Sequence, residues 1–121
     1  MKKKILIIED EQTLIKALLE TLKENGNITE TATDGETGLQ KIKEFKPDLV
    51  LLDLILPKMD GFTVLQKIRE DEEIRNTKVI VLTNLSDVAD KVKELGAADC
   101  VIKSDYSINE IHEKIKAKLG E

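Results

Sequence analysis

A net positive charge, a cysteine pair and a long apolar run are all missing from this 121-residue sequence. The formal net charge is −5, which argues against a broad basic surface that holds nucleic acid, so we expect no direct nucleic-acid binding. One cysteine, Cys100, excludes an internal disulfide and suits a reducing cytoplasm. The basic residues 2–4 precede only four apolar residues, too few for a signal peptide or a membrane span. We therefore expect a cytoplasmic protein that makes no membrane contact.

Linkers, low-complexity tracts and clear internal repeats are absent as well. The length suits one domain with a single core of ordinary size, so we assign residues 1–121 to one domain. Charged residues make up 36% and apolar residues 40%, and the apolar residues recur in short runs at regular intervals. This composition and pattern are typical of a soluble globular protein and argue against disorder.

Short aliphatic runs alternate with helical periodicity along the whole chain. The runs lie at residues 5–8, 49–52, 79–82 and 101–102, and a polar, β-branched stretch at 28–33 predicts an edge strand. Five helical faces lie between them: Leu14, Ile15, Leu18, Leu19 and Leu22; Leu39 and Ile42; Phe62, Leu65 and Ile68; Val88, Val92 and Leu95; Ile108, Ile111, Ile115 and Leu119. Nearly continuous apolar strands are buried on both faces, which predicts a parallel sheet between layers of helices. We therefore expect an α/β doubly wound, five-stranded parallel sheet of flavodoxin-like (βα)5 topology, with strand order 2-1-3-4-5.

Acidic residues stand where two of these strands end. Glu9 and Asp10 follow the first strand, and Asp53 follows the third. In the order 2-1-3-4-5 these strands are neighbours at the topological switch point, where ligands bind in such sheets. Three carboxylates that close cannot all stay ionised without a counter-charge, and Mg²⁺ is the natural one because it prefers oxygen ligands. The plainer reading, in which the acids only favour a helix N-terminus, explains Glu9 and Asp10 but not Asp53.

A hydroxyl and an ammonium group complete this edge of the sheet. Thr83 ends the fourth strand and Lys103 the fifth. Taken alone, Thr83 reads as a cap before a helix that starts near Ser86, and Lys103 as a solvated lysine. Together with the acids, at the ends of four separate strands, they predict a site for an anion with several oxygens.

From Lys3 to about Leu119 the chain resembles a receiver domain of a two-component response regulator, similar to the single-domain chemotaxis type. The motifs that carry the resemblance are ILIIEDE, DLVLLDLILPKMDG, VIVLTN and GAADCVIKS. The resemblance implies a phosphorylation switch that receives a phosphoryl group from a sensor histidine kinase. It also implies a domain that catalyses only its own phosphorylation and slow dephosphorylation, and that signals through the fourth helix, fifth strand and fifth helix. The same resemblance gives each residue a role: Asp53 as phosphoacceptor, Thr83 and Lys103 as phosphoryl contacts, and Glu9, Asp10, Asp53 and the backbone carbonyl of Ile55 as Mg²⁺ ligands.

Three departures from the family pattern carry predictions of their own. Ser104 stands where a proline, often after a cis bond, usually follows the lysine, so we predict a trans Lys103–Ser104 bond and a rearranged loop. Cys100 stands at a switch position that is usually aromatic, which removes the aromatic partner of Thr83. Ile55 and Leu85 lie two residues beyond Asp53 and Thr83, where polar side chains can help to position water. Two aliphatic side chains cannot do so, and we predict a long-lived phosphoryl group.

Two other function classes share this topology. A binding scaffold that is never phosphorylated fits Ser104 and Cys100 but leaves the acidic set unexplained. A phosphatase with an aspartyl nucleophile typically has a second aspartate two residues later, where this chain has Ile55. No effector domain fits beside a receiver in 121 residues, so we expect output through an unidentified protein target or through a phosphorylation-linked homodimer.

Overall fold

Five parallel strands and five helices alternate along the computed structural model, which describes residues 2–121. The order is β1 (Lys4–Ile8), α1 (Gln12–Glu24), β2 (Ile28–Ala32), α2 (Gly35–Phe45), β3 (Leu49–Leu52), α3 (Gly61–Glu70), β4 (Lys78–Thr83), α4 (Ala89–Glu94), β5 (Asp99–Ile102) and α5 (Ile108–Leu119), with a short 3₁₀ turn, η1 (Lys103–Asp105), after β5. The sheet has the order β2-β1-β3-β4-β5, with every pair parallel. The predicted fold class and strand order, with β2 at an edge, are therefore confirmed.

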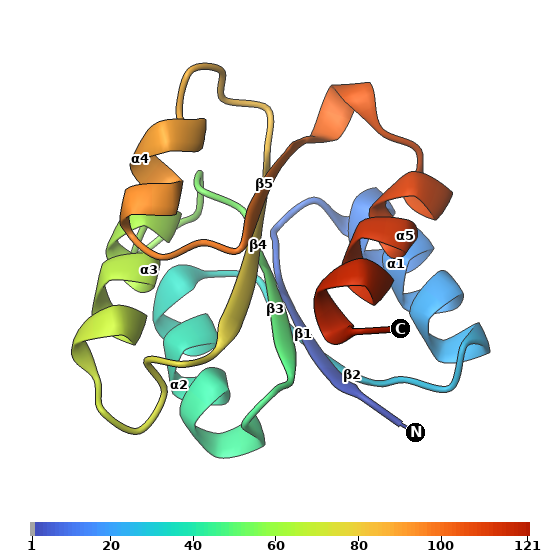
Figure 1. The fold of residues 1–121 in the computed structure, drawn as a ribbon, viewed down its shortest axis with the longest axis horizontal. Helices are drawn as coiled ribbons and strands as arrows, with labels where there is room; N and C mark the ends of the chain where they lie inside the picture. The colour runs from blue at the N-terminus through green and yellow to red at the C-terminus, as the bar shows by residue number, and fades with distance from the viewer. Residues whose placement is uncertain (1) are drawn as a thin grey trace.

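The helices cover both faces of the sheet, with α1 and α5 on one side and α2, α3 and α4 on the other (Figure 1). Alternate strand residues supply the two cores, because successive side chains of a strand point to opposite faces. Ile5, Ile7, Leu49 and Leu51 pack in the core under α1 and α5, and their neighbours in sequence pack under α2, α3 and α4. This double burial explains why β3 is wholly aliphatic and why β1 and β4 are almost so, in contrast to the edge strand β2.

The fourth helix is shorter than the sequence predicted. The expected helix from Ser86 is wrong, because α4 begins only at Ala89. Asp87 has a φ of +60°, and a residue in that left-handed region cannot belong to a right-handed helix. The loop between β4 and α4 is correspondingly longer, and it begins directly after Thr83.

Two further expectations can be checked on the backbone. Residues 2–121 contain no cis peptide bond, so the predicted trans Lys103–Ser104 bond is confirmed. None of the helices described is both long and apolar enough to cross a membrane.

Candidate functional site

The carboxyl edge of the sheet brings the predicted acidic residues together. Glu9 directly follows β1, and its N–H donates to the Ala32 carbonyl at 2.9 Å. Asp53 directly follows β3, and its N–H donates to the Ile8 carbonyl at 3.0 Å. Each acid is therefore held by the last backbone bond of a buried strand. One carboxylate oxygen from each of Glu9, Asp10 and Asp53 lies within 4.8 Å of the others.

Lys103 Nζ lies among these carboxylates. It is 3.1 Å from Asp53 Oδ2 and 2.5 Å from Glu9 Oε1, and Glu11 Oε1 is 3.8 Å away. Burial by itself lowers the pKa of Lys103, but the contacts with Glu9 and Asp53 outweigh it, and the pKa of Lys103 is raised. The lysine is therefore a fixed positive charge, and the alternative of a solvated surface lysine is wrong.

Glu9 is the most deeply buried acid of the cluster, with 2% of its surface exposed. Its Oε2 accepts the N–H groups of Asp10 and Glu11 at 3.0 and 3.1 Å. Its Oε1 is buried and has only the ion pair to Lys103, without the geometry of a hydrogen bond. Burial raises the pKa of Glu9, although Lys103 acts in the opposite direction. Glu9 thus has an oxygen that is short of partners and faces the cluster.

The Asp53 carboxylate has a defined orientation. Its Oδ1 accepts the Leu54 N–H at 2.7 Å, while its Oδ2 faces Lys103. The start of α3 packs directly on the backbone of Asp53, since a Cβ at Gly61 would lie 2.3 Å from the Asp53 carbonyl oxygen. Only glycine permits this close approach of the start of α3. Asp60 caps the same helix by accepting the Thr63 N–H at 3.0 Å.

The carboxylates suit a divalent metal ion. Two oxygens bound to one Mg²⁺ at about 2.1 Å lie at most about 4.2 Å apart, close to the spread of the carboxylate oxygens here. Three carboxylates face a single ammonium group, which leaves negative charge that a cation would balance. Hard oxygen donors without sulfur or nitrogen ligands favour Mg²⁺ over the softer transition metals. The residues present therefore fit the predicted ion.

Thr83 and Ile55 stand at the border of this cluster. Thr83 is fully buried at the end of β4, and its Oγ1 accepts the Leu85 N–H at 3.2 Å. In the part of the chain described, no hydrogen bond joins this hydroxyl to Asp53. The Ile55 side chain is 63% exposed beside the site.

Two residues near the site received no role from the sequence. Glu11 adds a further carboxylate beside Lys103, and Asn84 accepts the Ser104 N–H on its Oδ1 at 3.1 Å. Both residues lie inside the motifs that carry the resemblance. The sequence signals only the second contact, because a residue other than proline at position 104 has an N–H group that can donate.

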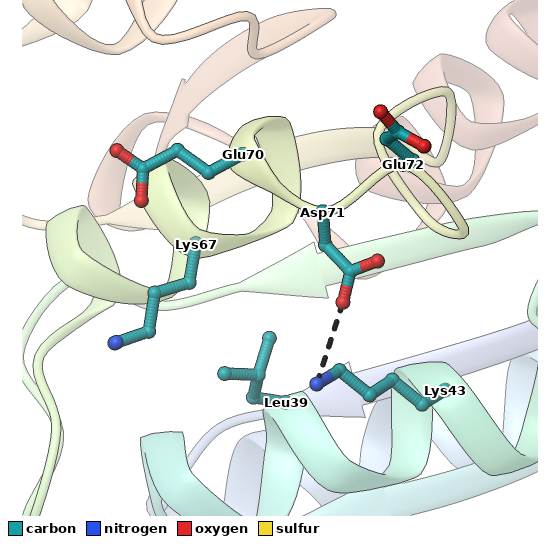
Figure 2. A pocket seen from close by; sticks show the side chains of 6 residues that line it. All are labelled: Leu39, Lys43, Lys67, Glu70, Asp71 and Glu72. Carbon is teal, nitrogen blue, oxygen red and sulfur yellow. Dashed lines mark ion pairs between the residues drawn. The ribbon is translucent and has the colours of Figure 1, made fainter.

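The groove between α2 and α3 is a separate feature. Figure 2 shows Lys43 of α2 paired with Asp71, at 3.3 Å, beside Leu39, Lys67 and Glu70. Because all of these residues except Leu39 lie in the last turn of α2 or α3 or just beyond α3, the groove lies toward the amino edge of the sheet. None of its lining residues belongs to the acidic cluster of Glu9, Asp10 and Asp53.

Comparison with known proteins gives a consistent result. A family model described as the response regulator receiver domain matches residues 5–116. A probable transcriptional regulator ycf27 from Guillardia theta is 42% identical over 120 residues, covering 98% of this chain and 46% of that protein. The chain thus spans about half the length of the curated relatives it matches.

Solved structures show the same fold. A CheY-like response regulator receiver domain from Methanospirillum hungatei has a TM-score of 0.88 at 29% identity, covering 99% of this chain and 95% of the other. The receiver domain of a sensor histidine kinase from Pseudomonas aeruginosa has a TM-score of 0.83 at 26% identity, covering 100% of both chains. That structure has a magnesium ion coordinated in its active site cleft.

Proposed function

The chain belongs to the response regulator receiver domain family of two-component signalling, and on that premise we propose that it is a switch phosphorylated on Asp53. One observation carries the proposal: a nearly buried carboxylate 3.1 Å from a lysine ammonium, with two further carboxylates within 4.8 Å. The arrangement offers a nucleophile, a fixed positive charge and the ligands for a cation in one place.

The chemistry follows from these groups. An oxygen of Asp53 attacks phosphorus, a P–O bond forms, and the P–N bond to a phosphohistidine of a sensor histidine kinase breaks. The electron pair of the broken bond stays on the imidazole nitrogen, which takes up a proton. Lys103 balances charge on the transferring oxygens, because its ammonium is already directed at Asp53. Glu9, Asp10, Asp53 and the Ile55 carbonyl would hold Mg²⁺, which supplies further charge neutralisation when bound.

The product would be read through the Thr83 loop. The phosphoryl group adds up to about two negative charges near Thr83. If the Thr83 hydroxyl turns to bind the phosphoryl group, its bond to the Leu85 N–H is lost and the loop to α4 moves. The face formed by α4, β5 and α5 would carry this change to a protein target or to a second copy of the chain. The domain, residues 1–121, would act in the cytoplasm, and its only catalysis would be its own phosphorylation and slow dephosphorylation.

Intact mass after incubation with Mg²⁺ and acetyl phosphate tests the proposal. We expect wild type to gain one phosphoryl group, and neither Asp53→Asn nor wild type with a chelator to gain it. Asp90→Asn, an exposed aspartate on α4, is the matched control and should be labelled like wild type. Size-exclusion chromatography of the same samples reports dimerisation. An unlabelled wild type would contradict the proposal and favour a binding scaffold.

A further inference from the structure

A hydrogen bond joins the two loops that carry the predicted phosphoryl contacts. Asn84 Oδ1 accepts the Ser104 N–H at 3.1 Å, across a sequence separation of 20 residues. Asn84 directly follows Thr83, and Ser104 directly follows Lys103. The bond therefore connects the loop of the hydroxyl group to the loop of the ammonium group.

Local geometry explains why these two loops meet. β4 and β5 are paired with Thr83 opposite Ile102, so the chain leaves the sheet at neighbouring points. The bond from the Leu85 N–H to Thr83 Oγ1 closes the first loop into a tight turn with Asn84 at its corner. The second loop begins as η1, and the first N–H groups of a helical turn have no partner inside the turn. Asn84 supplies the missing acceptor for Ser104.

This bond exists only because position 104 is not proline, since proline has no N–H to donate. We propose that Asn84 is a positioning residue for phosphoryl transfer, which holds the Ser104 amide and thereby keeps Lys103 against Asp53. This inference rests on the proposed function. In it, the hydrogen bond between Asn84 and Ser104 fixes the turn that follows Lys103.

The hydrogen bond between Asn84 and Ser104 opposes the attraction of Lys103 to carboxylates other than Asp53. Nζ is attracted by Glu9 at 2.5 Å and by Glu11 at 3.8 Å, as well as by Asp53 at 3.1 Å. Without the anchor at Ser104, the turn can follow the first two carboxylates and carry the ammonium away from the nucleophile. The acidic ligands themselves, on the loops after β1 and β3, keep their own backbone bonds.

The test measures the rate of Asp53 phosphorylation by acetyl phosphate at saturating Mg²⁺. Asn84→Ala removes the acceptor and Ser104→Pro removes the donor, and each should slow phosphorylation about fivefold, the value of one hydrogen bond. The double variant should be no slower than either single variant, because both remove the same bond. Ser104→Ala keeps the amide and Asn76→Ala alters an exposed asparagine elsewhere, so both should match wild type.

A second cycle separates positioning from a general structural role. In a Lys103→Ala background, Asn84→Ala should cause no further slowing, because the group it positions is gone. Equal slowing in both backgrounds would overturn the inference, as would Asn84→Ala and Ser104→Pro variants that react like wild type. An unlabelled wild type would instead defeat the proposed function itself, so the two failures are distinguishable.

Discussion

The two halves of the site are built differently. Glu9 and Asp53 follow β1 and β3, where all four residues of β3 are buried and the acids continue the backbone pairing of the sheet. Thr83 is the buried last residue of β4, but the loop after it leads to an α4 of only six residues. Lys103 follows β5, in which one of four residues is fully buried. The acidic half is thus held by the sheet itself, whereas the loops that follow β4 and β5, in which Asn84 and Ser104 are exposed, are packed less tightly. A switch needs this asymmetry, because one half must hold the reacting group while the other moves.

The largest expected effect is on folding, and it compares the same substitution in each half. Leu52→Ala, in fully buried β3, should lower the free energy of unfolding by about 3 kcal/mol through lost transfer energy and a cavity. Leu85→Ala, half-buried in the loop after Thr83, should cost about 1 kcal/mol. Urea denaturation of both variants measures the difference. Equal losses would show that the loop is packed as firmly as the sheet.

The second effect concerns the charge that joins the halves. Lys103→Ala should slow phosphorylation of Asp53 by about a hundredfold, because it removes the ammonium that contacts the nucleophilic carboxylate. Single-turnover labelling with acetyl phosphate measures the rate. Lys114→Ala, whose Nζ pairs with Asp99 at 3.7 Å, is the control and should keep the wild-type rate. A Lys103→Ala protein that reacts at full speed would mean that the lysine is only a structural counter-ion.

The third effect concerns Ile55, at the edge of the acidic cluster. Ile55→Asn should speed loss of the phosphoryl group about tenfold, since a side chain that binds the attacking water need contribute only about 1.4 kcal/mol. Ile28, a second exposed isoleucine, lies on edge strand β2 and provides the control, Ile28→Asn. Decay of the phosphorylated protein after removal of donor is followed by intact mass. If wild type already decays as fast as the Ile55→Asn variant, the predicted long lifetime is wrong.

The smallest effect is a pH dependence at the helix caps beside the site. Hydrogen bonds from the N–H groups of Thr37 and Thr63 lower the pKa of Asp34 and Asp60. Their stabilising effect is therefore present above the ordinary carboxyl range, near pH 4, and is lost as pH falls through the lowered values. Asparagine caps equally well but does not titrate. Urea unfolding at pH 6 and pH 3.5 should show a smaller loss for the Asp34→Asn, Asp60→Asn variant than for wild type, and equal losses would contradict the assignment.

Much of the acidic half could be predicted from the sequence. Aliphatic runs locate buried strands, and parallel strands end at one edge, so Glu9, Asp10 and Asp53 had to meet there. In the other half the pattern also placed Thr83 and Lys103 at strand ends, but it did not predict the conformation of the loops that follow them. The late start of α4 follows from the backbone conformation of Asp87, and the bond between Asn84 and Ser104 follows from how two loops leave the sheet. Such long-range loop contacts depend on tertiary structure rather than on periodicity.

Mapping the phosphorylated residue tests the central claim most directly. Wild type labelled with acetyl phosphate and Mg²⁺ would be digested, and the modified peptide sequenced by mass spectrometry. We predict a single phosphoryl group on Asp53, in the peptide that contains residues 49–56, and none when a chelator removes the metal. A phosphoryl group on another residue, or labelling of Asp53 that is unaffected by the chelator, would contradict it.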